Sequence, residues 1–173
     1  MTKSEITAEL LLEFKNVGEW YEKHPENKFE YGPVGKWNAA QILDHLITSA
    51  KPINLALSLP KLALGLKFGK SKKESRSYDE VVSVYQQALA DGGKAPANFE
   101  PPKEPARTKE KSLAKLAEEG QKLAAVANKW SDADLDKYQL PHPLIGNLSI
   151  RELLQFTIYH MRHHLKGLKA EYE

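Results

Sequence analysis

Apolar residues recur at intervals of three and four along several long stretches of the chain, which is the periodicity of an amphipathic α-helix. Four long stretches run from about Ser4 to Lys23, from Asn38 onward, from Thr108 to about Trp130 and from Ser149 to Glu171. A shorter one runs from Ser77 to about Leu89. No alternation with a period of two is found, so the pattern predicts an all-α protein without strands.

Capping motifs mark where three of these helices begin. In a capping box, two side chains three residues apart bind backbone N–H groups that the first helical turn leaves free. The boxes are Asn38 to Gln41, Ser77 to Glu80 and Ser149 to Glu152. Pro52 is expected to kink the second helix or end its first part. The connections from Pro96 to Pro105 and from Gln139 to Asn147 are predicted to be irregular.

The last stretch is apolar around well over half of its circumference, which is typical of a helix at the centre of a bundle. Four long helices joined by moderate to long connections indicate a four-helix bundle with extra short helices and long loops. The proline-rich connection does not divide the chain, because neither side of it has a complete core. We therefore expect a single domain over residues 1–173.

Composition narrows the class of protein. The chain has 173 residues, of which 41% are hydrophobic and 28% charged, and its net charge is +2, which indicates a globular domain. The low net charge favours neither nucleic acid nor a membrane surface as a partner, and no apolar run has the length of a membrane span. Cysteine is absent, so a metal would be held by His, Asp, Glu or water. A cytoplasmic location is expected.

A lysine-rich run lies between residues 61 and 76. One interpretation is a solvated, mobile surface loop between helices. The other is a lid that binds an anion or a phosphate group. No glycine-rich phosphate-binding spacing accompanies the run, so the sequence does not choose between them.

The strongest candidate chemistry lies in the last helix. His160 and His164 are four residues apart and share one face, so their imidazoles can bind one metal ion. His163 points to another side and is a weaker candidate. The glutamate that follows the first histidine in zinc proteases is replaced by Met161, so that motif is absent. Structural histidines with ordinary hydrogen-bond partners remain the alternative.

His45 strengthens the metal hypothesis, because it is the other histidine on the inner face of a predicted long helix. If its helix packs antiparallel to the last helix, His45, His160 and His164 meet at one level of the bundle. Three histidines leave metal positions open to water or substrate, which is typical of a catalytic site. His142 precedes a proline in a loop and is expected to stabilise a turn or to lie near the site. His24 is expected to be exposed.

The chain resembles the DinB/YfiT-like superfamily, in particular its DinB_2 and DUF1569 types. The resemblance is carried by the segment from Trp37 to Leu46, the segment from His142 to Ser149, and the pair His160 and His164 with Tyr159 before it. It implies an up-down-down-up four-helix bundle, often a homodimer. It also implies one divalent ion per chain, zinc or nickel, held by residues that match His45, His160 and His164.

The resemblance further implies a metal-dependent thiol S-transferase or hydrolase that acts on a small molecule, with a low-molecular-weight thiol as a possible partner. The lysine-rich segment and the proline-rich connection depart from the family pattern, which leaves the substrate open. Two alternatives stay beside the enzyme. One is a non-catalytic bundle that binds a metal or a small ligand, and the other is an interaction bundle with structural histidines.

Overall fold

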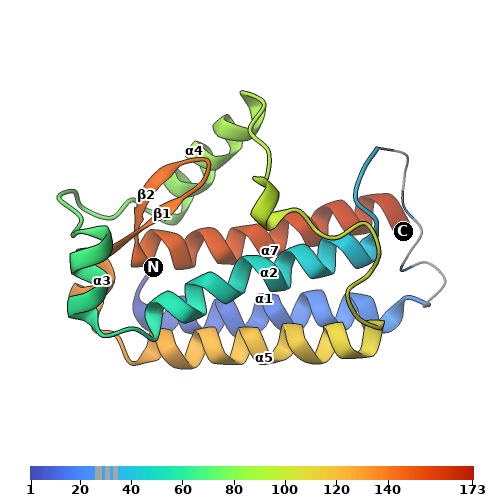
Figure 1. Cartoon of the computed structure of the whole chain (residues 1–173), viewed down its shortest axis with the longest axis horizontal. Helices are drawn as coiled ribbons and strands as arrows, with labels where there is room; N and C mark the ends of the chain where they lie inside the picture. The colour runs from blue at the N-terminus through green and yellow to red at the C-terminus, as the bar shows by residue number, and fades with distance from the viewer. Residues whose placement is uncertain (26–28, 30–31, 33–34) are drawn as a thin grey trace.

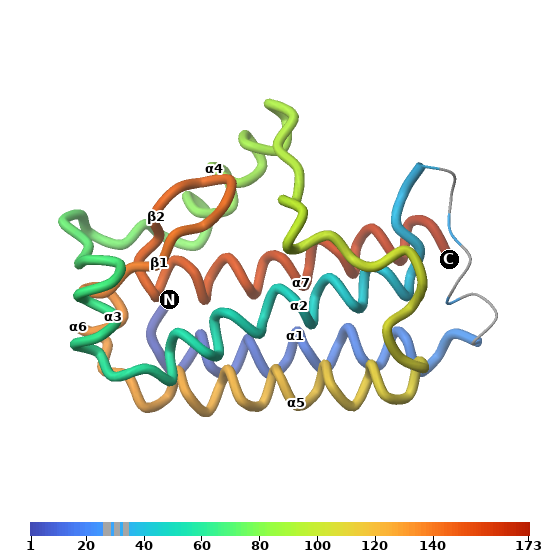
Figure 2. The backbone as a smooth tube through the Cα atoms, viewed as in Figure 1, coloured from blue at the N-terminus to red at the C-terminus, as the bar shows by residue number. Residues whose placement is uncertain are grey.

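The structure is a computed structural model that describes residues 1–25, 29, 32 and 35–173. Its body consists of four long helices: α1 (Lys3–Lys23), α2 (Ala39–Leu57), α5 (Lys109–Asn128) and α7 (Ile150–Tyr172). Helices α1 and α7 run in one direction, and α2 and α5 run in the opposite direction (Figures 1 and 2). The order along the chain is therefore up-down-down-up, and the prediction of an all-α bundle of this topology is confirmed apart from one small hairpin.

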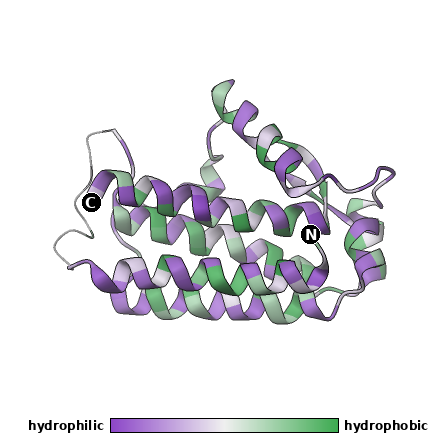
Figure 3. Ribbon diagram, turned by 180° about the vertical axis from the view of Figure 1, so that it is seen from behind, coloured by the Kyte–Doolittle hydropathy of each residue, from purple (hydrophilic) through white to green (hydrophobic). Residues whose placement is uncertain are grey.

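The packing follows the amphipathic pattern of the sequence. Helix α5 packs against both α1 and α2, and α1 packs against α7. Each long helix carries hydrophobic residues on one side and hydrophilic residues on the other (Figure 3). The inward residues form one continuous buried core, which removes apolar surface from water and is the main stabilising term of such a bundle. Among the described residues, no helix is long and apolar enough to cross a membrane.

The helix starts agree closely with the capping motifs. Asn38, Ser77 and Ser149 each cap a helix in a complete capping box, as predicted. Thr2 caps α1 in the same way. Pro52 does not end α2, which continues to Leu57.

The long crossing from α2 to α5 contains three short helices: α3 (Lys61–Phe68), α4 (Tyr78–Ala90) and the 3₁₀ turn η2 (Ala97–Phe99). The first part of the lysine-rich run is thus helical. In the part that follows, the backbone N–H of Ser71 donates a hydrogen bond to the carbonyl oxygen of Lys137 (2.8 Å), which fixes this segment against the end of α6. Helix α4 packs on α7. The crossing therefore covers the side of the bundle that α2 and α7 form (Figure 1).

The expectation that the chain contains no strand is wrong. After α6 (Asp132–Lys137), strands β1 (Gln139–His142) and β2 (Gly146–Ser149) form an antiparallel hairpin within the segment expected to be irregular. Each strand has four residues, which is too short for a period of two to be recognised. The turn ends at Gly146, whose φ of +74° favours glycine. The hairpin packs against the beginning of α7.

Candidate metal centre

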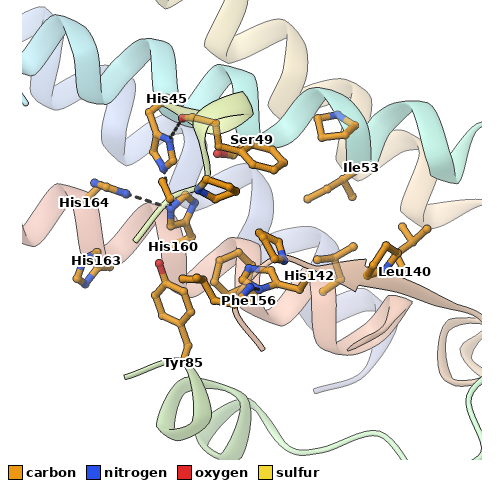
Figure 4. Close-up of a pocket in the computed structure, with 18 of the residues that line it drawn as sticks. His45, Ser49, Ile53, Tyr85, Leu140, His142, Phe156, His160, His163 and His164 are labelled. Carbon is orange, nitrogen blue, oxygen red and sulfur yellow. Dashed lines mark hydrogen bonds between the residues drawn. The ribbon is translucent and has the colours of Figure 1, made fainter. Parts of the chain in front are cut away.

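Three histidines from two helices meet in the middle of the bundle. His45 lies in the second turn of α2, whereas His160 and His164 lie one turn apart in α7 (Figure 4). Because α2 and α7 run in opposite directions, the first half of one helix lies beside the second half of the other. The sequence prediction that these three side chains share one level of the bundle is therefore met by the structure.

The three rings point their Nε2 atoms at one place. Nε2 of His160 lies 3.1 Å from Nε2 of His45 and 3.0 Å from Nε2 of His164. One ligand atom from each residue lies within 4.8 Å of the other two. Nitrogens that bind one metal at about 2.1 Å lie about 3.0 to 3.4 Å apart, depending on the coordination geometry. The observed separations fit this range.

A backbone carbonyl orients the His45 ring. Nδ1 of His45 lies 2.7 Å from the carbonyl oxygen of Phe99 in η2, and this contact requires the ring to donate from Nδ1. Nε2 of the neutral ring then carries a lone pair that faces the other two histidines. A hydrogen bond of this kind is the usual outer support of a metal-binding histidine. The Trp37 ring packs on the other side of His45, with centroids 4.8 Å apart.

Burial keeps the cluster uncharged at neutral pH. It lowers the pKa of His160 and His164 well below 6.5, and the neighbouring imidazoles lower both further. Burial also lowers the pKa of His45, although the hydrogen bond to Phe99 opposes the shift. Neutral imidazole is the form that binds metal, so all three rings are ready to act as ligands.

Hydrogen bonding within the cluster cannot satisfy all three nitrogens. Nε2 of His160 lies within hydrogen-bond distance of Nε2 of both His45 and His164. A proton on Nε2 of His160 can form a good hydrogen bond with only one of these two nitrogens. At least one lone pair is then left in a buried place without a strong partner, which costs free energy. A divalent cation accepts all three lone pairs at once. The donor set therefore fits a metal ion, and its three neutral nitrogens suit a transition metal better than calcium or magnesium.

The cluster lies at the wall of a pocket of about 340 Å³. Aliphatic and aromatic side chains from α2, α4, η2, the hairpin and α7 line most of it. The polar side chains in the lining include Ser49, Tyr85 and five histidines, of which three form the cluster. No Asp, Glu, Lys or Arg side chain of the described residues lines it. The pocket thus suits a small and largely apolar molecule.

The remaining histidines have three different roles. His163 lines the pocket but is not part of the converging group, as predicted. His142 both stabilises the hairpin turn and lines the pocket, so the two interpretations of this residue combine. His24 is half-buried rather than exposed, because its ring stacks on Trp20 with centroids 4.0 Å apart.

Sequence reasoning missed the contribution of Phe99. The contact with His45 is made by a backbone carbonyl in the proline-rich connection, and a carbonyl leaves no mark on the residue pattern. Asp44, the residue before His45, does not line the pocket and forms an ion pair with Arg107 at 2.9 Å.

An up-down-down-up bundle with three imidazoles converging from two of its helices defines a class, the four-helix bundles with an internal histidine cluster. Within that class, the chain belongs to the DinB superfamily, whose DinB_2 model matches residues 6–167. The histidine cluster can hold a divalent metal ion.

Among solved structures, the chain is similar to YfiT from Bacillus subtilis, described as a probable metal-dependent hydrolase with an unusual four-helix bundle topology. The TM-score is 0.64 with 20% sequence identity, over 97% of this chain and 84% of that chain. At this identity the likeness establishes the fold. A comparison with curated proteins gives no match.

Proposed function

We propose that this protein is a metal-dependent enzyme that holds one divalent ion, zinc or nickel, on His45, His160 and His164 and acts on a small, largely apolar molecule. The observation that carries the proposal is the convergence of three neutral Nε2 atoms at the wall of an apolar pocket. A purely structural role for the cluster would favour partners that satisfy each ring separately, and the three rings instead face one another.

A bound divalent ion would supply Lewis acidity and lower the pKa of a water molecule or thiol beside it. The residues of the chain provide the surroundings for that chemistry. The Phe99 carbonyl fixes the His45 ring, and Phe156 stacks on His160 with centroids 5.2 Å apart. The rest of the pocket is lined mostly by apolar side chains, and a less polar environment strengthens electrostatic interactions.

Hydrolysis is the first candidate reaction, because the similar bundle YfiT is described as a probable metal-dependent hydrolase. Thiol S-transfer is the second, and the lining of the pocket favours it. No carboxylate of the described residues lines the pocket to accept a proton from water. A thiol has a pKa of about 8.5 against about 15.7 for water, so it needs less help to ionise.

Metal content and product analysis test the proposal. Protein purified without chelator is expected to carry one divalent ion per chain by elemental analysis, and His160→Ala is expected to carry none. The loaded protein is then given an activated aryl ester in ¹⁸O-labelled water, and separately an aryl epoxide with a small thiol. Hydrolysis places ¹⁸O in the product, whereas S-transfer gives a thioether.

His163→Ala is the matched control, because His163 is adjacent to His164 in the same helix but is not part of the converging group. It is expected to keep the ion. Loss of metal from both variants to the same degree, or a wild type that binds neither zinc nor nickel at neutral pH, would refute the assignment. A stably bound ion without turnover of either substrate would favour the non-catalytic binding module.

A further inference from the structure

His142 has a fixed tautomer that the metal hypothesis does not use. The residue ends β1, and its Nδ1 accepts hydrogen bonds from the backbone N–H groups of Leu144 (3.2 Å) and Ile145 (3.3 Å). An imidazole nitrogen that accepts two N–H groups has a free lone pair, so in the neutral ring the proton lies on Nε2. The hairpin turn therefore holds His142 as an Nε2–H donor.

This donor has no conventional acceptor. Only 9% of the surface of His142 is exposed, and no described residue accepts a hydrogen bond from its Nε2. The ring stands edge-on to the rings of Phe156 and Tyr85, with centroids 4.4 and 6.0 Å apart. Aromatic faces are weak acceptors and replace a carbonyl oxygen poorly. Nε2 of His142 is not among the buried polar atoms of the described residues that lack a partner, so it is accessible from the pocket that His142 lines, and an oxygen of a bound molecule can accept from it.

The position of His142 relative to the metal cluster gives the donor a use. His142 lines the same pocket as His160, and the Phe156 ring lies between the two, 4.4 Å from one and 5.2 Å from the other between centroids. A molecule that reaches both histidines therefore extends past the Phe156 ring. Burial lowers the pKa of His142 to about 4, so the ring donates without carrying charge at neutral pH.

We propose that His142 is a positioning residue whose Nε2–H binds a neutral oxygen acceptor of the substrate, such as a ketone, ester or ether oxygen, at the end of the pocket away from the metal cluster. The inference rests on the proposed function only for the statement that the reaction occurs at that cluster. It narrows the substrate to a largely apolar molecule whose oxygen acceptor lies on the far side of Phe156 from the reacting atoms. A carboxylate in that place is disfavoured, because no Lys or Arg side chain of the described residues lines the pocket.

A pair of probes of nearly equal shape tests the donor directly. Acetophenone carries a carbonyl oxygen where α-methylstyrene carries a CH₂ group, and both fit a pocket of about 340 Å³. The wild type is expected to bind the ketone about 5-fold more tightly than the hydrocarbon, which is the usual effect of one hydrogen bond. Binding is measured by NMR titration with the protein as purified and again after chelation. Because the chelated protein has no metal for the ketone to bind, this arm does not depend on the proposed function.

Two substitutions separate the donor from the turn. In His142→Asn, the amide oxygen can still accept from the N–H groups of Leu144 and Ile145, but the donor at the Nε2 position is lost. In His142→Gln, the longer amide restores a donor near that position. The preference for the ketone is expected to disappear in the first variant and to return in part in the second, with the metal content unchanged in both.

The ring nitrogens provide a second measurement that needs no ligand. In spectra of protein with ¹⁵N-labelled histidine, His142 is expected to show the Nε2–H tautomer, and its proton is expected to shift downfield on addition of acetophenone. Four results would each overturn the proposal: a proton on Nδ1, equal affinity of the wild type for both probes, an unchanged preference in His142→Asn, or no binding of either probe at millimolar concentration.

Discussion

The two sides of the bundle differ in how they are packed. On one side, α1 and α5 are in close contact, and the absence of a side chain at Gly120 lets Phe14 lie against the backbone of α5. On the other side, α2 and α7 make few direct contacts with each other. Histidine rings and a pocket of about 340 Å³ occupy that side instead, and the crossing segment with its helices α4 and η2 covers it.

The contrast shows how a small domain can keep a polar cluster in its interior. Close apolar packing supplies most of the stability of a domain of this size. The contact between α1 and α5, together with those of α1 with α7 and of α5 with α2, provides most of this packing, and the direct contact between α2 and α7 provides less. The α2–α7 side is then free to keep an open pocket and three imidazoles that are not well satisfied by one another. We therefore expect substitutions on the first side to change stability and those on the second to change binding.

The largest effect that separates the two sides is expected from Gly120→Ala. A Cβ atom at this position would lie 2.5 Å from Cγ of Phe14 and 2.7 Å from its Cβ, so the α1–α5 contact must open. The free energy of unfolding is expected to fall by about 2 to 3 kcal/mol, measured by urea denaturation. The affinity of the folded protein for zinc is expected to stay within about twofold, because the histidines lie on the other side.

Gly18 offers a matched control on the facing helix. It is also a glycine inside a long helix, but a Cβ atom there would meet nothing within 4 Å. Gly18→Ala is expected to stabilise the protein by about 0.5 to 1 kcal/mol, the usual gain in helix propensity. If Gly120→Ala lowered zinc affinity as strongly as it lowered stability, the two sides would be coupled and the contrast would not hold.

The long-range periodicity of the sequence predicted the bundle well, because each of the long helices needs only its own apolar stripe and cap to be recognised. The meeting of His45 with His160 and His164 could also be predicted from the sequence, on the condition that the two helices pack antiparallel. Antiparallel packing places the first half of one helix beside the second half of the other. The hairpin was missed, because four-residue strands leave no clear pattern. The contact between Phe99 and His45 was missed for a different reason, namely that any residue can supply a backbone carbonyl.

A smaller effect is expected on the α2–α7 side from Asp44→Ala. The buried Asp44 carboxylate accepts hydrogen bonds from the backbone N–H of Ala106 (3.0 Å) and from Arg107 (2.9 Å). These contacts fix the end of the connection that carries Phe99. Without them the Phe99 carbonyl is held less firmly against His45, and zinc affinity is expected to fall about 10-fold, as for other outer supports of metal ligands.

Competition of the Asp44→Ala protein with a chromogenic chelator measures the change in zinc affinity. Lys36→Ala serves as the control, because it removes an exposed ion pair with Glu171 at the edge of the bundle. Its zinc affinity is expected to equal that of the wild type. An unchanged affinity in Asp44→Ala would show that η2 holds the Phe99 carbonyl in place without help from the Asp44 contacts.

The smallest effect concerns pH and the ion pair that joins the crossing segment to α7. Burial opposes ionisation of Glu152, but hydrogen bonds from the side chain and backbone of Arg76 and from the backbone of Ser149 outweigh it and lower the pKa of Glu152 below 4.5. The unfolded chain therefore takes up this proton at a higher pH than the folded protein does. The stability that Glu152 contributes is present above about pH 4.5 and is lost as the pH falls through the lower pKa of Glu152 in the folded protein.

Since the buried histidines also destabilise the fold in acid, the measurement is the difference in urea midpoint between the wild type and Glu152→Gln. This difference is expected to shrink from pH 6 to pH 3, and a difference that stayed constant would mean that Glu152 acts through its shape and not through its charge.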